Sequence, residues 1–94
     1  MFPLGQTVMT PGAQEIMERL DPDGNVQRYA SGLLDRHVSG DWGDVDEQDR
    51  GTNENALKHD GRLMSVYGTD FATKLYVITE ADRSVTTILT PRDY

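Results

Sequence analysis

The residues best suited to binding or chemistry lie in one stretch, residues 37–49. Trp42, the only tryptophan of the chain, stands there between two glycines. Five of the nine residues from position 41 onward are carboxylates and none of the nine is basic: Asp41, Asp44, Asp46, Glu47 and Asp49. A large aromatic beside concentrated negative charge suits a surface that binds a partner. Trp42 has two interpretations, a core side chain or an exposed anchor, and burial is the favoured one.

Residues 80–84 are the second candidate, because their place between two expected strands makes them a hairpin tip, where loops often carry function. Glu80, Asp82 and Arg83 are available there to contact a partner. The simpler interpretation, which we favour, is turn chemistry. In that case Asp82 and Ser84 bond nearby amides, and Arg83 pairs with Glu80 or Asp82.

Catalytic and metal sites have weaker signals. His37 lies on the apolar stripe of a helix near its end, so we expect it to be half-buried and bonded to a backbone carbonyl. The alternative is a small enzyme or ligand-binding domain that brings His37, Asp41 and residues 80–84 into one pocket. A calcium loop starting at Asp44 would have Asp49 where an EF-hand requires glycine. His37 and Asp41 cannot complete a zinc shell, and no phosphate-binding glycine loop is present, so no metal or cofactor is predicted.

Two helices precede the acidic stretch. Thr10 followed by Pro11 is typical of a helix start, with threonine as the N-cap and proline at the first helical position. A second helix is expected over residues 26–37, where apolar residues recur along one face. Its ends are marked by Asp23 or Asn25 as the N-cap and by Gly40 as the stop.

A third helix is expected to start within the acidic stretch. Residues 44–47, Asp-Val-Asp-Glu, resemble a capping box, which places its first residue near Val45. Gly51 and the two polar residues after it weaken the middle of this helix, so a kink or a split is expected there.

The hydrophobic period changes from 3.6 to 2 after Gly61. Three segments rich in Val, Ile, Thr and Tyr follow at residues 63–67, 74–79 and 85–90, with linkers short enough for hairpins. They predict a three-stranded antiparallel meander, and residues 4–10 predict a short N-terminal strand. The expected fold is therefore a small single α+β domain over residues 1–94. Its helical part, two to three helices over about 11–58, packs on a meander over about 61–90.

Charge limits the choice of partner. Sixteen acids against nine bases give a formal charge of −7, which disfavours direct nucleic-acid binding and favours a basic protein partner. No apolar run approaches the roughly 20 residues that span a bilayer, so no membrane is expected. The absence of cysteine and of a signal peptide fits the cytoplasm. A homodimer in which residues 85–89 of two copies pair is a further possibility.

Three motifs together indicate a relationship: residues 4–13 (LGQTVMTPGA), 37–44 (HVSGDWGD) and 76–91 (YVITEADRSVTTILTP). With them the chain resembles, over nearly its whole length, a family of small bacterial proteins from plasmids and integrated elements. Members are labelled plasmid-related or named as restriction-system subunits. A methyltransferase subunit needs a cofactor fold that 94 residues without a glycine loop cannot supply. This sequence departs from the family's more simply helical pattern at residues 50–53.

The resemblance implies an accessory protein of mobile DNA and brings no catalytic residues with it. Our leading hypothesis is a non-enzymatic interaction module that presents Trp42 and the carboxylates to a basic protein surface. In a mobile element, such a module could serve counter-defence by occupying the DNA-binding groove of a host nuclease or CRISPR complex. Its carboxylates would then imitate the charge of phosphates.

Overall fold

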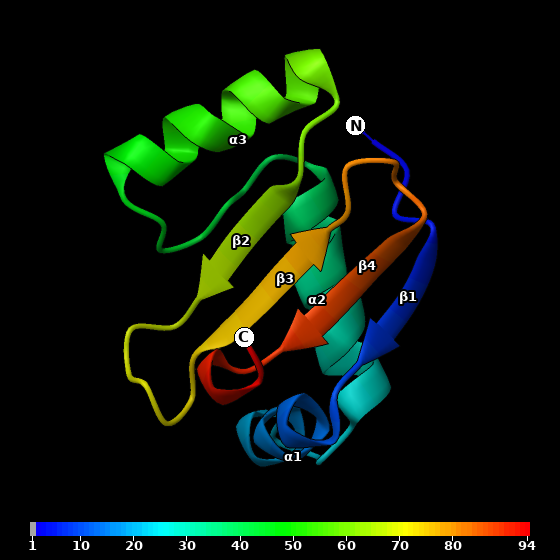
Figure 1. The fold of residues 1–94 in the computed structure, drawn as a ribbon. Coiled ribbons are helices and arrows are strands. Elements are labelled where there is room, and N and C mark those ends of the chain that lie inside the picture. The colour runs from blue at the N-terminus through cyan, green and yellow to red at the C-terminus, as the bar shows by residue number, and fades with distance from the viewer. Residues whose placement is uncertain (1) are drawn as a thin grey trace.

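The computed structural model describes residues 2–94, and the expected α+β class is confirmed. In chain order its elements are β1 (Gln6–Met9), α1 (Pro11–Leu20), α2 (Val26–Val38), α3 (Glu47–His59), β2 (Leu63–Tyr67), β3 (Leu75–Thr79), β4 (Val85–Leu89) and the 3₁₀ helix η1 (Pro91–Asp93). In Figure 1, α2 lies behind the sheet, α1 lies near its lower end and α3 runs beside β2. None of the helices within residues 2–94 combines the length and the apolar character needed to cross a membrane.

The sheet has four strands in the order β1-β4-β3-β2, and it is mixed. β2, β3 and β4 pair antiparallel, whereas β1 pairs parallel with β4. The expectation of a three-stranded antiparallel sheet was therefore incomplete. The N-terminal strand joins it because the N–H of Gln6 donates to the carbonyl of Ser84 (2.9 Å) and the N–H of Thr10 donates to that of Ile88 (3.0 Å).

The position of β4 inside the sheet rules out the possible dimer in which residues 85–89 of two copies pair. Both edges of β4 are already occupied, one by β1 and the other by β3. A second copy therefore cannot pair with this strand unless the sheet opens.

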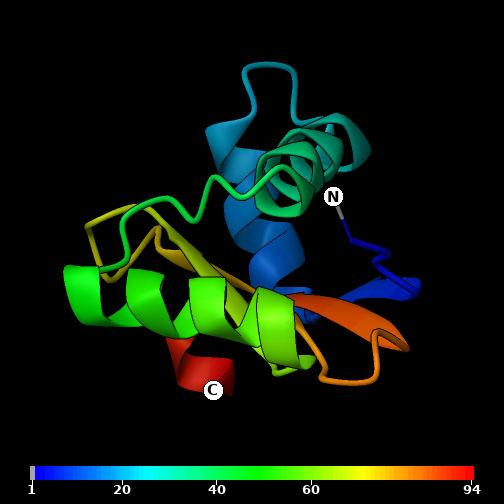
Figure 2. The same cartoon turned by 90° about the horizontal axis from the view of Figure 1, so that it is seen from above.

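The two N-terminal helices begin where their caps predicted. The Thr10 hydroxyl accepts from the N–H of Ala13 (3.1 Å), and the side chain of Asn25, rather than that of Asp23, accepts from Arg28 N–H (3.0 Å). Figure 2 shows α1 and α2 on one side of the sheet. Their apolar faces meet the strands in a core of Ala13, Ile16, Met17, Ala30, Leu33, Tyr67, Leu75, Val77 and Ile88. Burial of each large member stabilises the fold by about 1.5–3 kcal/mol.

The structure corrects two expectations for α3. Asp46, not Asp44, is its N-cap, with the carboxylate accepting from the N–H of Asp49 (2.8 Å), so the helix begins at Glu47. The expected kink at Gly51 is absent from the described helix, which is continuous over Glu47–His59. Gly51 faces open space and weakens the helix by about 1 kcal/mol, which is too little to break it.

Candidate interaction surface

Four carboxylates form the acidic surface: Asp44, Asp46, Glu47 and Asp49. All four are exposed, in the loop before α3 or in its first turn, where the helix dipole favours negative charge. Asp44 accepts from the N–H of Gly68 (2.8 Å), which ties the loop to the end of β2. Among residues 2–94, none of the four forms an ion pair. No direct ion pair therefore neutralises these four carboxylates, although Arg36 acts on Asp44 electrostatically.

Asp41 does not belong to the acidic surface, although the sequence analysis predicted it to be one of the interacting carboxylates. Its carboxylate accepts from the Arg36 Nε at 2.7 Å, and this bond lowers the pKa of Asp41. The Arg36 guanidinium also lies over the Tyr67 ring, 4.4 Å from its centroid. The Tyr67 hydroxyl donates to the Asp41 carbonyl (2.7 Å), so Asp41 belongs to a local structural cluster and its charge is balanced by Arg36.

Trp42 is buried, with 1% of its surface exposed, so it cannot act as an anchor for a partner. The favoured interpretation, burial, is confirmed, and the alternative of an exposed anchor is wrong. Its indole N–H donates to a carboxylate oxygen of Glu54 on α3 (2.9 Å). The ring packs with Ala56 and Leu63 in a second core cluster that joins α3 to β2.

His37 is fully buried and bonds side chains, not the backbone carbonyl that was expected. The carbonyl of Leu4 can only accept, so the Thr86 hydroxyl donates to it (2.7 Å). The Thr79 hydroxyl must then donate to Thr86 Oγ1 (2.7 Å), and His37 Nε2–H must donate to Thr79 Oγ1 (2.9 Å). His37 Nδ1 is left to accept from the Ser65 hydroxyl (2.6 Å). The network thus fixes a proton on Nε2, and Nδ1 accepts from Ser65 when the imidazole is neutral.

Burial lowers the pKa of His37 to about 4, because a charged imidazole would lose its hydration. The ring also packs edge-on against Phe2 and Trp42, with centroids 5.2 and 5.7 Å away. A side chain with no exposed surface cannot reach a substrate. The pocket that was the alternative, built from His37, Asp41 and residues 80–84, is therefore not formed around this imidazole.

The hairpin tip at residues 80–84 follows turn chemistry. Asp82 accepts from the N–H (3.0 Å) and the hydroxyl (2.6 Å) of Ser84, and these bonds lower the pKa of Asp82. Glu80 pairs with Arg62 at 3.5 Å instead of with Arg83, which corrects the expected pairing. Neither carboxylate extends the acidic surface, because Arg62 balances the charge of Glu80 and the β3–β4 hairpin that carries Asp82 lies away from the loop before α3 (Figure 1).

Arg83 binds carbonyls instead of carboxylates. Its guanidinium donates to Gly61 O (2.6 Å), Glu80 O (3.2 Å), Ala81 O (3.2 Å) and Ala56 O (3.3 Å). Arg83 itself has a φ of 61°, an uncommon conformation for a non-glycine residue. Because the contacted carbonyls include the last turn of α3, this cation locks the hairpin tip to the negative end of the helix. Arg83 is therefore a structural residue.

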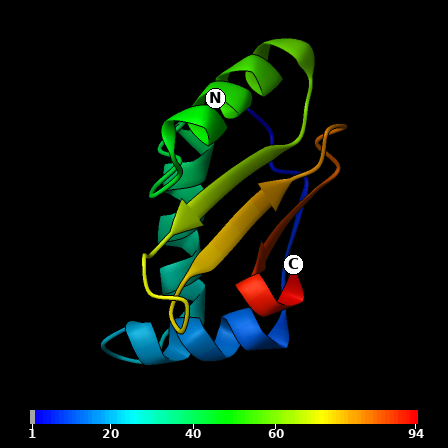
Figure 3. The same ribbon diagram turned by 60° about the vertical axis from the view of Figure 1, so that its left-hand side comes forward.

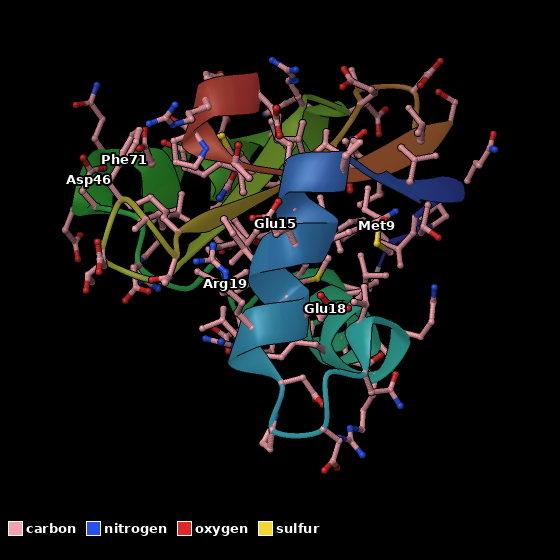
Figure 4. All side chains as sticks on the ribbon, turned by 90° about the horizontal axis from the view of Figure 1, so that it is seen from below. Met9, Glu15, Glu18, Arg19, Asp46 and Phe71 are labelled. Carbon is pink, nitrogen blue, oxygen red and sulfur yellow. The ribbon has the colours of Figure 1, made fainter. Side chains whose placement is uncertain are left out.

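Sequence reasoning missed Phe71, which is 59% exposed in the loop between β2 and β3. Its position in the sequence, an aromatic residue in a polar turn between two expected strands, could have indicated this exposure. Figure 4 shows Phe71 and Asp46 on the same side of the view from below, whereas Figure 1 shows the β2–β3 loop well below the start of α3. The hydrogen bond between Gly68 and Asp44 joins the same loop to the acidic surface. Phe71 is therefore an exposed aromatic in the loop that Asp44 bonds, whereas Tyr94, 66% exposed, lines a hollow with Asp49.

Phe71 also borders a cavity of about 490 Å³ between α1 and η1. Arg19 and Arg92 line this cavity together with Glu15, and neither arginine makes an ion pair within the described part of the chain. The two arginines make this side of Phe71 positively charged, so the acidic surface does not extend here.

Within residues 2–94, no cluster of three or more histidine and carboxylate side chains has the arrangement of a metal site. Comparisons with protein-family models, with curated proteins and with solved structures found no match to this chain.

Proposed function

We propose that this protein is a non-enzymatic interaction module that binds a basic protein through its acidic surface, with Phe71 as the apolar contact. The observation that carries the proposal is the grouping of four exposed carboxylates without ion pairs at the start of α3, bonded through Asp44 to the β2–β3 loop that carries the exposed Phe71. Unpaired surface carboxylates attract a basic partner over about one Debye length, roughly 10 Å at 0.1 M salt. A large aromatic then supplies the apolar part of the contact.

The resemblance to mobile-element proteins suggests the sharper form of this proposal, which is counter-defence. A host nuclease or CRISPR complex carries a basic groove that attracts phosphates. Carboxylates in the loop and first turn of α3 would occupy such a groove with charge of the same sign. This form also agrees with the net charge of −7, which disfavours direct contact with nucleic acid.

The test is affinity capture from a bacterial host lysate at low ionic strength, with elution by salt. The decisive variant combines Asp44→Asn, Asp46→Asn and Asp49→Asn. An asparagine oxygen still accepts from the N–H groups of Gly68 and Asp49 that the native carboxylates bond, so three charges are removed while the loop and the N-cap are kept. We expect the variant to lose the basic protein that the wild type captures.

The matched control removes three charges from other exposed positions: Glu18→Gln, Asp35→Asn and Asp60→Asn. It should capture the partner as the wild type does, because the potential of the acidic surface is unchanged. Phe71→Ser should weaken the captured complex by roughly tenfold, the size expected for one central aromatic contact. Equal capture by the decisive variant and the control, at any level, would contradict the proposal.

A further inference from the structure

The two edges of the sheet differ in how they are protected. At the β2 edge, the side-chain amide of Asn53 donates to Met64 O (2.7 Å), and its oxygen accepts from Met64 N–H (3.0 Å). Farther along β2, Val66 N–H donates to Trp42 O (3.0 Å) and Asp44 N–H donates to Val66 O (2.6 Å). These four bonds use the outward-facing groups of Met64 and Val66. No further strand can pair with β2 at these residues.

The β1 edge has no such protection. In the parallel ladder the N–H groups of Gln6 and Thr10 point to β4, and successive residues of a strand alternate. The backbone groups of Thr7 therefore point outward, and so do those of Met9. Figure 3 shows α3 beside β2, whereas Figure 1 shows no element of the described chain beyond β1. Gln6, Thr7 and Val8 are all exposed.

The unprotected strand also carries no charged side chain of its own, and the nearest carboxylate that the structure bonds to this segment is that of Asp93, at the Thr10 hydroxyl after the strand (2.6 Å). The first charged side chain of the sequence is Glu15, and residues 1–14 are the longest stretch without one. Charged side chains are a common means of preventing strand addition at an edge. Two copies that each carry −7 would repel each other least along a strand, such as Gln6–Met9, that has no carboxylate of its own. The uncharged strand thus favours a second copy over a basic partner, which would find no carboxylate on its residues.

We infer that two copies associate through antiparallel pairing of their β1 strands about a two-fold axis at Thr7. In this register Thr7 of one copy lies opposite Thr7 of the other, and the two exchange N–H···O=C bonds. The two sheets then form one continuous sheet. Because α3 lies at the opposite edge from β1, each copy keeps its acidic surface exposed. The inference is independent of the proposed function.

Single-cysteine cross-linking tests this register directly, since the chain has no cysteine of its own. Directly opposite residues in a hydrogen-bonded antiparallel pair have Cα atoms about 5.5 Å apart, within the range that a disulfide spans. Thr7→Cys should therefore form a covalent dimer rapidly under mild oxidation. Thr69→Cys, at an exposed threonine of the β2–β3 loop, is the matched control and should cross-link slowly. Equal rates for the two variants would overturn the inference.

Sedimentation of the untagged chain from about 10 µM to about 1 mM supplies the second measurement. The average mass of the wild type should rise toward twice that of the monomer. Thr7→Glu, which places like charges opposite each other, should lower the association constant by roughly fivefold, and Thr69→Glu should leave it unchanged. A chain that stays monomeric throughout, or a dimer equally sensitive to both glutamates, would show that β1 does not pair two copies.

Discussion

The buried imidazole of His37 makes the stability of this protein depend on pH well above the range in which its carboxylates titrate. As pH falls below 6.5, the unfolded chain protonates this histidine, whereas the folded chain does not until about pH 4. The unfolded state thus binds more protons in this pH range, and the free energy of unfolding falls as the pH is lowered. The fall in pKa from 6.5 to about 4 corresponds to about 3 kcal/mol of unfolding free energy lost between these two pH values.

A loss of that size is a large part of the roughly 5–15 kcal/mol that stabilises a typical domain. The carboxylates whose pKa is lowered in the folded state contribute mainly below pH 4 and do not obscure it. Urea unfolding at a series of pH values measures the loss, with the fluorescence of the buried Trp42 as the signal.

The comparison variant is His37→Phe, which keeps a ring between Phe2 and Trp42 but cannot titrate. At pH 7 it should be less stable than the wild type by roughly 2–4 kcal/mol, because the hydroxyls of Ser65 and Thr79 each lose a partner. Its stability should be nearly constant between pH 6.5 and 4, so the two proteins converge. If the single variant does not fold, adding Ser65→Ala removes one orphaned hydroxyl. A wild-type curve as flat as that of the variant would refute the reasoning.

Three further outcomes follow from the structure. Asn53→Ala should lower the free energy of unfolding in urea by about 2–4 kcal/mol, because it removes the two bonds to Met64. The same variant should aggregate more in light scattering, because the β2 edge becomes free to pair. Asn55→Ala, exposed on the same helix, should change neither quantity. Gly43→Ala should lower the free energy of unfolding in urea by more than about 3 kcal/mol, since φ is +74° and the new Cβ would overlap the backbone of β2. Gly51→Ala, in open space, should raise the free energy of unfolding by about 0.5–1 kcal/mol. The bond to Arg28 lowers the pKa of Asp21 from 3.8 to about 2, so acid unfolding should include a loss of stability across that interval that Asp21→Asn abolishes.

Features coded by neighbouring residues were predictable from the sequence. The start of α1 at Thr10-Pro11 and the presence of the last three strands depend on local backbone preferences, and the structure contains both. Local rules failed where two solutions competed. Asp44 and Asp46 are both acceptable N-caps, and the choice depends on Asp44 being used by Gly68, which is distant in sequence.

The remaining features depend on contacts between distant segments. No local pattern shows that β1 pairs with β4 or that Asn53 bonds the edge of β2. The candidate site was affected in the same way. Trp42 and His37 look like functional residues because they are polar or aromatic and stand near glycines and acids, yet packing buries both. The exposure of Phe71 was not predicted, because the tertiary fold decides whether an aromatic residue in a loop is exposed.

The most direct test of the proposed function is the association rate of the captured partner with this protein, measured by stopped flow as salt is increased. For the wild type we expect the rate constant to fall by roughly tenfold or more between about 20 mM and about 500 mM salt. The variant carrying Asp44→Asn, Asp46→Asn and Asp49→Asn should associate slowly at low salt and respond little to its increase. The same steep salt dependence in wild type and variant would contradict the claim that the acidic surface guides binding.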